Sequence, residues 1–272
     1  MLDTQPLEAS GAFARPFRPR RVGIVGGGTA GLLTALALKE WQPELEVTLL
    51  ESSKIPVIGV GEATTPPIVP FLFGYLGIDP HQFERAVAPT WKLGIRFEWG
   101  APEPWYFNYA FGDGDLADAQ RHDGHPNRYA MTSMLMSADK GPVAKVGGKL
   151  IPLLNETRFA LHLDNERLVA FLHARARAVG VTLVDATLGD VEVERGHGSQ
   201  RHIKRALFDI DGTSQALSFD LWVDCTGFRS LLLGKALEVP FESYADALFT
   251  DTAVTCVRDN GGQPRPYTTA TT

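Results

Sequence analysis

The stretch from residue 21 to residue 51 changes from strand-like to helix-like spacing of apolar positions and back again. A short apolar run, Val22–Val25, ends in the glycine-rich segment 26–31, and leucines and alanines at helical spacing follow it. A second apolar run, Val47–Leu50, closes the stretch. The pattern predicts strand, turn, helix and strand, which is the repeating unit of an α/β fold.

The spacing of the glycines in the first turn indicates a dinucleotide site. The turn reads GGGTAG and fits GxGxxG with Gly26, Gly28 and Gly31 at the fixed positions. The first glycine permits a tight turn, the second lets the backbone approach a pyrophosphate, and the third lets the helix pack on the strand. Glu51 lies twenty residues after Gly31, where a carboxylate can accept hydrogen bonds from ribose hydroxyls. Strand, helix and acid together favour this interpretation over an ordinary glycine-rich turn.

The segment 55–67, IPVIGVGEATTPP, is the second unusual stretch. Its two glycines and three prolines predict an irregular loop, although several of its residues are apolar. From the residues alone, this loop either connects two elements or closes over a cofactor. Helices are expected next at 68–76 and at 79–87, the second with Asp79 as its N-cap.

Residues 91–99, WKLGIRFEW, alternate strictly between apolar and polar side chains. Such alternation predicts one strand with a buried face and a polar face in solvent. Lys92 and Arg96 fall on the polar face, and the pattern by itself gives neither of them a function.

Residues from about 100 to 155 lose the regular pattern and predict an insertion into the nucleotide-binding domain. Glycine, proline and aspartate are frequent here, and a short helix is expected near Met131. Aromatic residues gather at the start of the insertion, at Trp105, Tyr106, Phe107, Tyr109 and Phe111. Their spacing is compatible with a core as well as with substrate contacts.

Regular elements return with a strand at 159–163 and a helix from its predicted N-cap, Asp164, to Gly180. Four further strands are expected at 181–184, 188–194, 203–210 and 216–224. The last three predict an antiparallel meander, because turn-rich segments separate them. The final strand ends at Asp224, where an acid and a small-residue turn lead into a helix and return the chain to the nucleotide site.

Composition restricts the class of protein further. The 272 residues are 44% hydrophobic and 21% charged, which is typical of a globular protein, and a net charge of -6 argues against nucleic-acid binding. Two cysteines without a CxxC motif favour a reducing cytoplasm, and no apolar run is long enough for a membrane span. Residues 1–19 are expected to form a flexible basic leader.

The histidines do not predict a metal site. His122 and His125 flank a DG turn but have no acidic or cysteine partner at metal-ligand spacing. Four further isolated histidines are expected to be structural: His162, His173, His197 and His202.

Five motifs together resemble the flavin-dependent tryptophan halogenases. They are, in order, GGGTAG, GVGEAT, WKLGIRF, FALHLD and VDCTGFRSLL, and the resemblance runs from about Arg21 to Thr269. It implies an α/β fold of the glutathione-reductase type, a Rossmann FAD-binding domain with an antiparallel meander and an aromatic-rich insertion. The family continues for a second half with a WxWxIP motif and a catalytic glutamate. Nothing in this chain matches that half, so 20–272 resemble the FAD-binding half.

The resemblance assigns roles to individual residues. The positions that it implies for FAD binding are Gly26, Gly28, Thr29, Ala30, Gly31, Glu51, Gly61, Glu62, Ala63, Thr64, Asp224 and Gly227. Lys92 matches the family's essential lysine, which would face a tunnel instead of water. Tyr109 and Phe111 match aromatic residues that stack on the substrate. Histidine stands at the Tyr109 position in the free-tryptophan enzymes, so an indole or phenol, free or within a larger molecule, is the expected substrate.

The chemistry implied by the resemblance uses FAD reduced to FADH2 by a separate flavin reductase, with O2 and chloride or bromide as co-substrates. Lys92 would direct the resulting hypohalous acid to one carbon of an electron-rich ring, as a compact and titratable cation can. Two alternatives remain open. The chain could belong to a flavin-dependent aromatic hydroxylase, which needs neither halide nor Lys92, or to a non-catalytic, truncated flavin-binding protein.

Overall fold

The computed structural model describes residues 18–55, 61–99, 105–112, 127, 130–154, 157–195, 201–256, 262 and 264–271. The predicted leader lies almost wholly outside these residues. His122, His125 and His197 also lie outside them, as do residues 56–60 of the irregular loop. The limits of the insertion at about 100–155 therefore stay a prediction.

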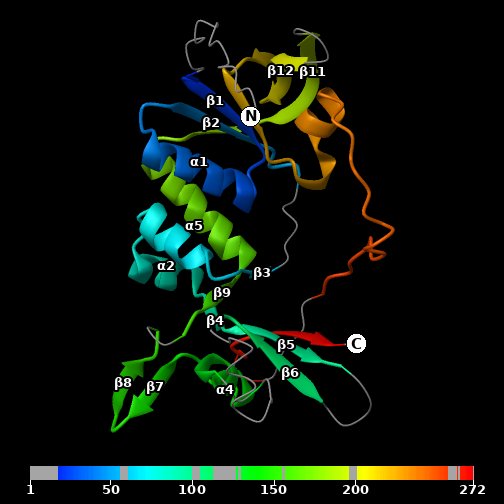
Figure 1. Ribbon diagram of the computed structural model, residues 1–272. Helices are drawn as coiled ribbons and strands as arrows, with labels where there is room; N and C mark the ends of the chain where they lie inside the picture. Colours follow the sequence, from blue (N-terminus) through cyan, green and yellow to red (C-terminus); the bar gives the residue numbers. More distant parts are fainter. Residues whose placement is uncertain are drawn as a thin grey trace, which may run out of the picture.

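The described elements form a mixed α/β fold (Figure 1). The strands are β1 (Arg21–Val25), β2 (Glu46–Glu51), β3 (Glu62–Ala63), β4 (Thr90–Lys92), β5 (Gly94–Glu98), β6 (Tyr106–Ala110), β7 (Val143–Val146), β8 (Lys149–Pro152), β9 (Ala160–Leu163), β10 (Thr182–Asp185), β11 (Thr187–Arg195), β12 (Arg201–Ile210), β13 (Thr213–Leu217), β14 (Leu221–Asp224) and β15 (Thr268–Thr271). The helices are α1 (Thr29–Trp41), α2 (Pro80–Val87), α4 (Met131–Ser137) and α5 (Asn165–Ala178), with short helices η1 (Pro70–Tyr75), η2 (Gly227–Arg229) and η3 (Leu231–Ala236).

A parallel sheet in the order β10-β2-β1-β14 organises one end of the molecule, and α1 and α5 cover one of its faces (Figure 1). Alternate residues of each strand serve opposite faces. Ile24 and Leu49 belong to the hydrophobic cluster that includes the helices, whereas Val25 and Leu50 belong to the cluster of the meander β11-β12-β13. The predicted strand-turn-helix-strand unit and the α/β fold class are confirmed.

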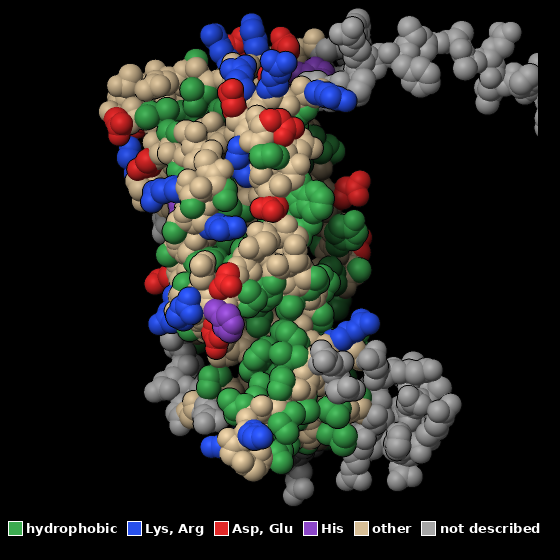
Figure 2. All heavy atoms as spheres, turned by 90° about the vertical axis from the view of Figure 1, so that its left-hand side faces the viewer, with side chains coloured by type: hydrophobic (Ala, Val, Ile, Leu, Met, Phe, Trp, Pro, Cys, Tyr) green, Lys and Arg blue, Asp and Glu red, His purple; other side chains and the backbone are tan. Residues whose placement is uncertain are grey.

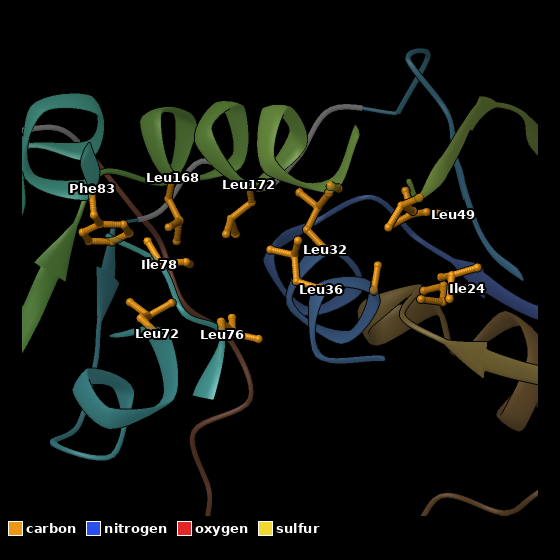
Figure 3. Close-up of a cluster of buried hydrophobic side chains, with 14 of the residues drawn as sticks. Ile24, Leu32, Leu36, Leu49, Leu72, Leu76, Ile78, Phe83, Leu168 and Leu172 are labelled. Atoms are coloured by element: carbon orange, nitrogen blue, oxygen red, sulfur yellow. The ribbon is translucent and has the colours of Figure 1, made fainter. Parts of the chain in front are cut away.

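Side chains from α1, α5, η1 and α2 meet in the larger cluster (Figure 3). Leu168 and Leu172 point into it from α5. The N-cap expected for α5 is confirmed, because the Arg167 amide donates to Oδ1 of Asp164 over 2.9 Å. The cap of α2 is confirmed in the same way by a 2.7 Å bond from the Gln82 amide to Asp79. The short helix near Met131 is α4, whereas the helix expected at 68–76 is the single π-helical turn η1.

The prediction of one strand over 216–224 is wrong. The meander ends with β13, and β14 joins the parallel sheet beside β1. Asp220 causes the change of sheet, because its Oδ2 accepts the amide hydrogens of Arg20 and Arg21, each over 2.9 Å. These bonds hold Asp220 beside the first residue of β1, so the residues that follow Asp220 pair with β1 instead of β12.

The prediction of one strand over 91–99 is also wrong. β4 pairs with β9, while β5 pairs with β6 and β15 in another sheet. Leu93 lies between them, donating its amide hydrogen to Pro266 and accepting one from Phe111, both over 2.7 Å. Gly94 allows the second sheet to approach, since a Cβ there would lie 2.3 Å from the Tyr109 carbonyl oxygen. The expected solvated face is wrong too, because Lys92 is 4% and Arg96 7% exposed.

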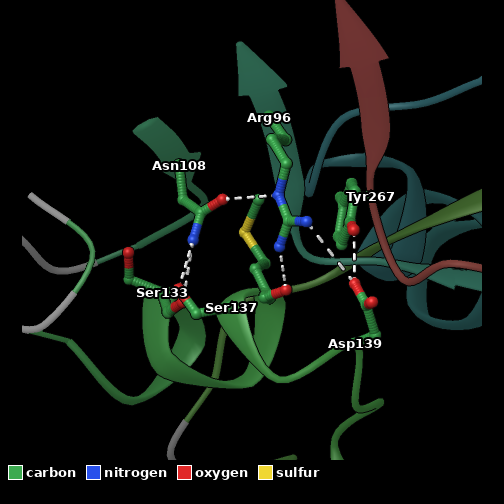
Figure 4. Close-up of polar contacts among 7 residues, drawn as sticks. Arg96, Asn108, Ser133, Ser137, Asp139 and Tyr267 are labelled. Atoms are coloured by element: carbon green, nitrogen blue, oxygen red, sulfur yellow. Dashed lines mark hydrogen bonds and ion pairs between the residues drawn. The ribbon is translucent and has the colours of Figure 1, made fainter. Parts of the chain in front are cut away.

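Arg96 joins the second sheet to α4 (Figure 4). Its Nε donates to Asn108 over 3.1 Å, its NH2 group donates to the Met136 carbonyl, and its NH1 group lies 3.6 Å from Asp139. The guanidinium also lies 4.0 Å from the ring centre of Tyr267. Burial and a hydrogen bond to Asp139 raise the pKa of Tyr267 to about 12, so its hydroxyl stays protonated. The contacts of Arg96 thus connect β5 to β6, to α4 and to the segments that carry Asp139 and Tyr267.

The surface is uneven in character. On the face in Figure 2, hydrophobic side chains gather over the middle and lower parts, and charged side chains gather at the upper end. Large apolar side chains are also exposed after β14, at Phe228, Leu233, Val239, Phe241, Tyr244, Leu248, Phe249 and Val254. Among the described residues, no helix combines the length and the apolar character needed to cross a bilayer.

The packing of α5 generates a test of the core. Leu172→Ala should lower the free energy of unfolding by about 2–5 kcal/mol, because it leaves a cavity at a fully buried site. Urea unfolding followed by circular dichroism measures the change. Leu248→Ala is the matched control, since this side chain is 69% exposed and the same truncation there should cost less than about 0.5 kcal/mol. Equal losses in the two variants would contradict the core described above.

Candidate functional site

The turn between β1 and α1 has the geometry of a dinucleotide site. Gly26 has φ +116°, which side-chain-bearing residues rarely adopt, and a Cβ on Gly31 would lie 1.9 Å from the Gly26 carbonyl oxygen. Among the described residues, in contrast, no atom lies within 4 Å of a Cβ placed on Gly28. No described side chain caps α1, and the first turn of the helix carries no acid. The turn therefore offers open space in front of an uncapped helix N-terminus, which fits the pyrophosphate of FAD.

Glu51 lies against this turn. A Cβ on Gly27 would be 1.9 Å from Oε2 of Glu51, and the same oxygen lies 3.0 Å from Nε2 of His173. Burial raises the pKa of Glu51, although the contact with His173 acts to lower it. The expectation that His173 is isolated is wrong. His173 lies three residues before buried Ala176 and therefore borders the buried face of α5, which was the available signal.

The loop around residue 62 also contacts the turn. Oε1 of Glu62 accepts hydrogen bonds from Thr29 Oγ1 over 3.4 Å and from Asn165 Nδ2 over 3.1 Å. Asn165 Nδ2 in addition lies 3.2 Å from Thr29 Oγ1, so a buried amide on α5 joins both segments. Glu62 consequently lies beside the turn between β1 and α1, and the cofactor role that the resemblance implies for residues 61–64 stays a prediction. Asn165 was missed from the sequence, where only the capping residue before it was noticed.

A small sheet, β3-β9-β4, connects this loop to Lys92. Thr64 follows β3, and its hydroxyl donates to the Leu161 carbonyl over 2.7 Å. Nζ of Lys92 donates to the Thr64 carbonyl over 2.9 Å. Burial lowers the pKa of Lys92, so this ammonium releases its proton more readily than a lysine in water. Lys92, a titratable cation, is therefore bonded to the same segment, residues 62–64, that contacts the turn between β1 and α1.

The predicted substrate residues occupy different positions relative to Lys92. The ring centre of Phe111 lies 5.4 Å from Nζ of Lys92. Tyr109 lies two residues earlier on β6, and its side chain is 63% exposed. The structure therefore brings Phe111 to the lysine and leaves Tyr109 on an open surface. Phe97 and Phe107 stack nearby, with ring centres 4.8 Å apart, so part of the aromatic group packs within the hairpin.

Asp224 ends β14 beside the same turn, paired with Val25 of β1. Its carboxylate accepts hydrogen bonds from the amides of Thr226, Leu232 and Leu233 over 2.8–3.0 Å. Burial acts to raise the pKa of Asp224, but these bonds and the Thr226 hydroxyl lower it overall. In this structure the carboxylate orders the chain into η3. Gly227 has φ +63° with open space at its Cβ position, which leaves room for a ligand at the turn.

Comparison with known proteins identifies similar chains. A sequence profile of the tryptophan halogenase family matches residues 21–272. The crystal structure of MibH, described as a lanthipeptide tryptophan 5-halogenase, is 48% identical with a TM-score of 0.84, over 96% of this chain and 50% of MibH. BrvH, a flavin-dependent halogenase from Brevundimonas sp. BAL3, is 32% identical with a TM-score of 0.73, over 94% of this chain and 52% of BrvH.

A curated relative gives the same result. ThaL, a tryptophan 6-halogenase from Streptomyces albogriseolus, is 32% identical over 93% of this chain and 51% of ThaL. The chain thus spans about half the length of the relatives that it matches.

The glycine geometry generates a matched pair of variants. Gly31→Ala should lower the free energy of unfolding by about 1–3 kcal/mol, because the added methyl group would overlap the Gly26 carbonyl oxygen. Gly28→Ser should change it by less than about 0.5 kcal/mol, since the site is open and serine is a favourable N-cap. Chemical unfolding of both proteins is the measurement. A tolerated Gly31→Ala would show that α1 packs less closely on β1 than described.

Proposed function

The chain belongs to the tryptophan halogenase family, and we propose that it forms the FAD-binding part of a flavin-dependent halogenase that acts on an electron-rich aromatic ring such as an indole. The observation that carries the proposal is the buried contact of Lys92 with the Thr64 carbonyl, 2.9 Å long, beside the ring of Phe111. Through Glu62, the same loop contacts the turn that fits a dinucleotide. A bound cofactor and Lys92 would then belong to one active site, because the segment that carries Glu62 and Thr64 contacts both the turn and the lysine.

The chain's own residues would hold the cofactor in a defined orientation. The open space at Gly28 would take the pyrophosphate, and the carboxylate of Glu51 would bind ribose hydroxyls. Residues 61–64, with Asp224 and Gly227, would border the remainder of FAD. When bound and reduced by a separate flavin reductase, FAD would activate O2, and the activated O2 would oxidise chloride or bromide to hypohalous acid, with release of water and oxidised FAD.

Lys92 would position that oxidant. An ammonium has three donors, and the Thr64 carbonyl accepts one of them, which fixes Nζ while the other donors can bind an oxygen or halogen atom. Burial excludes water from the group and strengthens its hydrogen bonds. A lowered pKa also allows Lys92 to give up a proton to the reacting oxygen. A lysine in solvent would have neither property.

For the substrate, we propose an indole, with a tryptophan inside a peptide as a specific candidate. The likeness to MibH, whose description names a lanthipeptide, supports a peptide over free tryptophan. The exposed side chains of Trp105 and Tyr109, 59% and 63% accessible, would give a large substrate an aromatic surface next to Phe111. The alternative, a flavin-dependent hydroxylase, would transfer oxygen without needing halide or Lys92.

The first test is mass spectrometry of indoles and tryptophan-containing peptides incubated with the protein, FAD, a flavin reductase, NADH and bromide. We expect a brominated product that depends on bromide. A hydroxylated product without bromine would favour the hydroxylase. Retention of flavin without any product would favour either an incomplete halogenase or a flavin-binding protein without catalytic activity, and the same test on a longer chain that carries the family's second half would decide between them.

A second test addresses Lys92 directly. Lys92→Met should reduce halogenation by about 10²–10³-fold, because the oriented hydrogen-bond donor is lost, while flavin retention and O2 consumption continue. Lys145→Met is the control, since Lys145 lies exposed on β7, and it should keep full activity. Product yield and O2 uptake are measured in parallel. Full halogenation by Lys92→Met would refute the role proposed for this lysine.

A further inference from the structure

His162 shares a sheet face with Lys92. In the register of β9 and β4, Lys92 pairs with Ala160 and Thr90 pairs with His162. Because residues two apart on a strand share a face, Lys92 and His162 are diagonal neighbours across the two strands. The expectation that His162 is isolated is therefore wrong.

Hydrogen bonds hold the imidazole between the two sheets of the site. Its Nε2 lies 2.9 Å from Oγ1 of Thr268 on β15, and the ring also bonds the backbone of Trp91 on β4. β15 pairs with β5, the strand that follows β4 after one residue. His162 thus joins the sheet that carries Lys92 to the sheet next to Phe111.

The electrostatic surroundings favour a neutral ring. Burial and the positive charge of Lys92 lower the pKa of His162, and the bond to the Trp91 backbone only partly opposes them. Lys92 is the charge facing the ring among the described residues of β4. Glu62, on β3, contacts Thr29 on the far side, and β15 holds only threonine and alanine. A neutral ring accepts or donates hydrogen bonds without repelling the nearby ammonium.

We propose that His162 is a positioning residue for Lys92: held neutral between the Trp91 backbone and Thr268, it keeps the ammonium directed at Thr64 and Phe111. This inference rests on the function proposed for Lys92. Protonation of the ring would place two cations on one sheet face and would displace the more mobile one, the Lys92 side chain. The activity should accordingly fall on the acid side through protonation of His162.

The contact itself can be tested without catalysis. Proton NMR follows the titration of the His162 ring, whose signal is identified by its absence from His162→Gln. In Lys92→Met the ring should titrate at higher pH than in the unaltered protein, because the repelling charge is gone, and in Lys145→Met its midpoint should not move. An unchanged midpoint in Lys92→Met would overturn the proposal, whether or not the protein halogenates.

The functional consequence is tested by the pH profile of halogenation. Glutamine can keep the bond to Thr268 but does not titrate, so His162→Gln should extend activity to lower pH than the unaltered protein. Its activity at neutral pH should stay within about tenfold, whereas His162→Ala should lose more at every pH. If the halogenation activity of His162→Gln falls at the same acid pH as that of the unaltered protein, the proposal is overturned.

Thermal unfolding gives an independent readout. Since the folded pKa of His162 lies below its unfolded value of about 6.5, the neutral ring's contribution is complete above that pH and is lost as pH falls through the folded pKa. The unaltered protein should therefore lose more stability than His162→Gln over this acid window. Equal losses of stability in the two proteins would contradict a His162 ring that titrates with a lowered pKa in the folded state.

Discussion

A buried ammonium needs a hydrogen-bond acceptor, and this requirement explains how the two ends of the molecule are joined. Lys92 meets it with the carbonyl oxygen of Thr64, 2.9 Å away. Hydrogen bonds between Thr64 and the backbone of Leu161 on β9 hold Thr64 in place, so its carbonyl oxygen stays directed at Lys92. The three-stranded sheet β3-β9-β4 thus links Lys92 to the segment that contacts the glycine turn between β1 and α1.

The carboxylates near the turn between β1 and α1 likewise need hydrogen-bond partners, because they are partly buried. Glu62 accepts bonds from Thr29 and Asn165, and Asp224 accepts backbone amides at the start of η3. Each carboxylate orders a segment that follows a strand of the parallel sheet, close to the turn that contains Gly28. Segments that are already ordered cost less conformational entropy when a ligand binds.

The sequence was informative where the decisive interactions are local. The glycine turn, the caps Asp79 and Asp164 and the strand pattern of β1 and β2 depend on residues a few positions apart, and their prediction is confirmed. The break at Leu93 depends on Pro266, and the contact of Glu51 depends on His173. No periodicity reports partners more than a hundred residues away. The assignment of individual residues to FAD and substrate came from the resemblance and stays a prediction.

Lys92 and Arg96 illustrate why burial alone does not identify a reactive cation. Both face inward four residues apart, yet Arg96 is surrounded by the carbonyl of Met136, the side chains of Asn108 and Asp139 and two tyrosine rings. A planar guanidinium with its donors occupied is a structural group. Lys92 has one acceptor and one ring among the described contacts, and burial lowers its pKa. The capacity to bind a further atom and to exchange a proton therefore resides in the lysine, and a neutral imidazole beside it preserves that capacity.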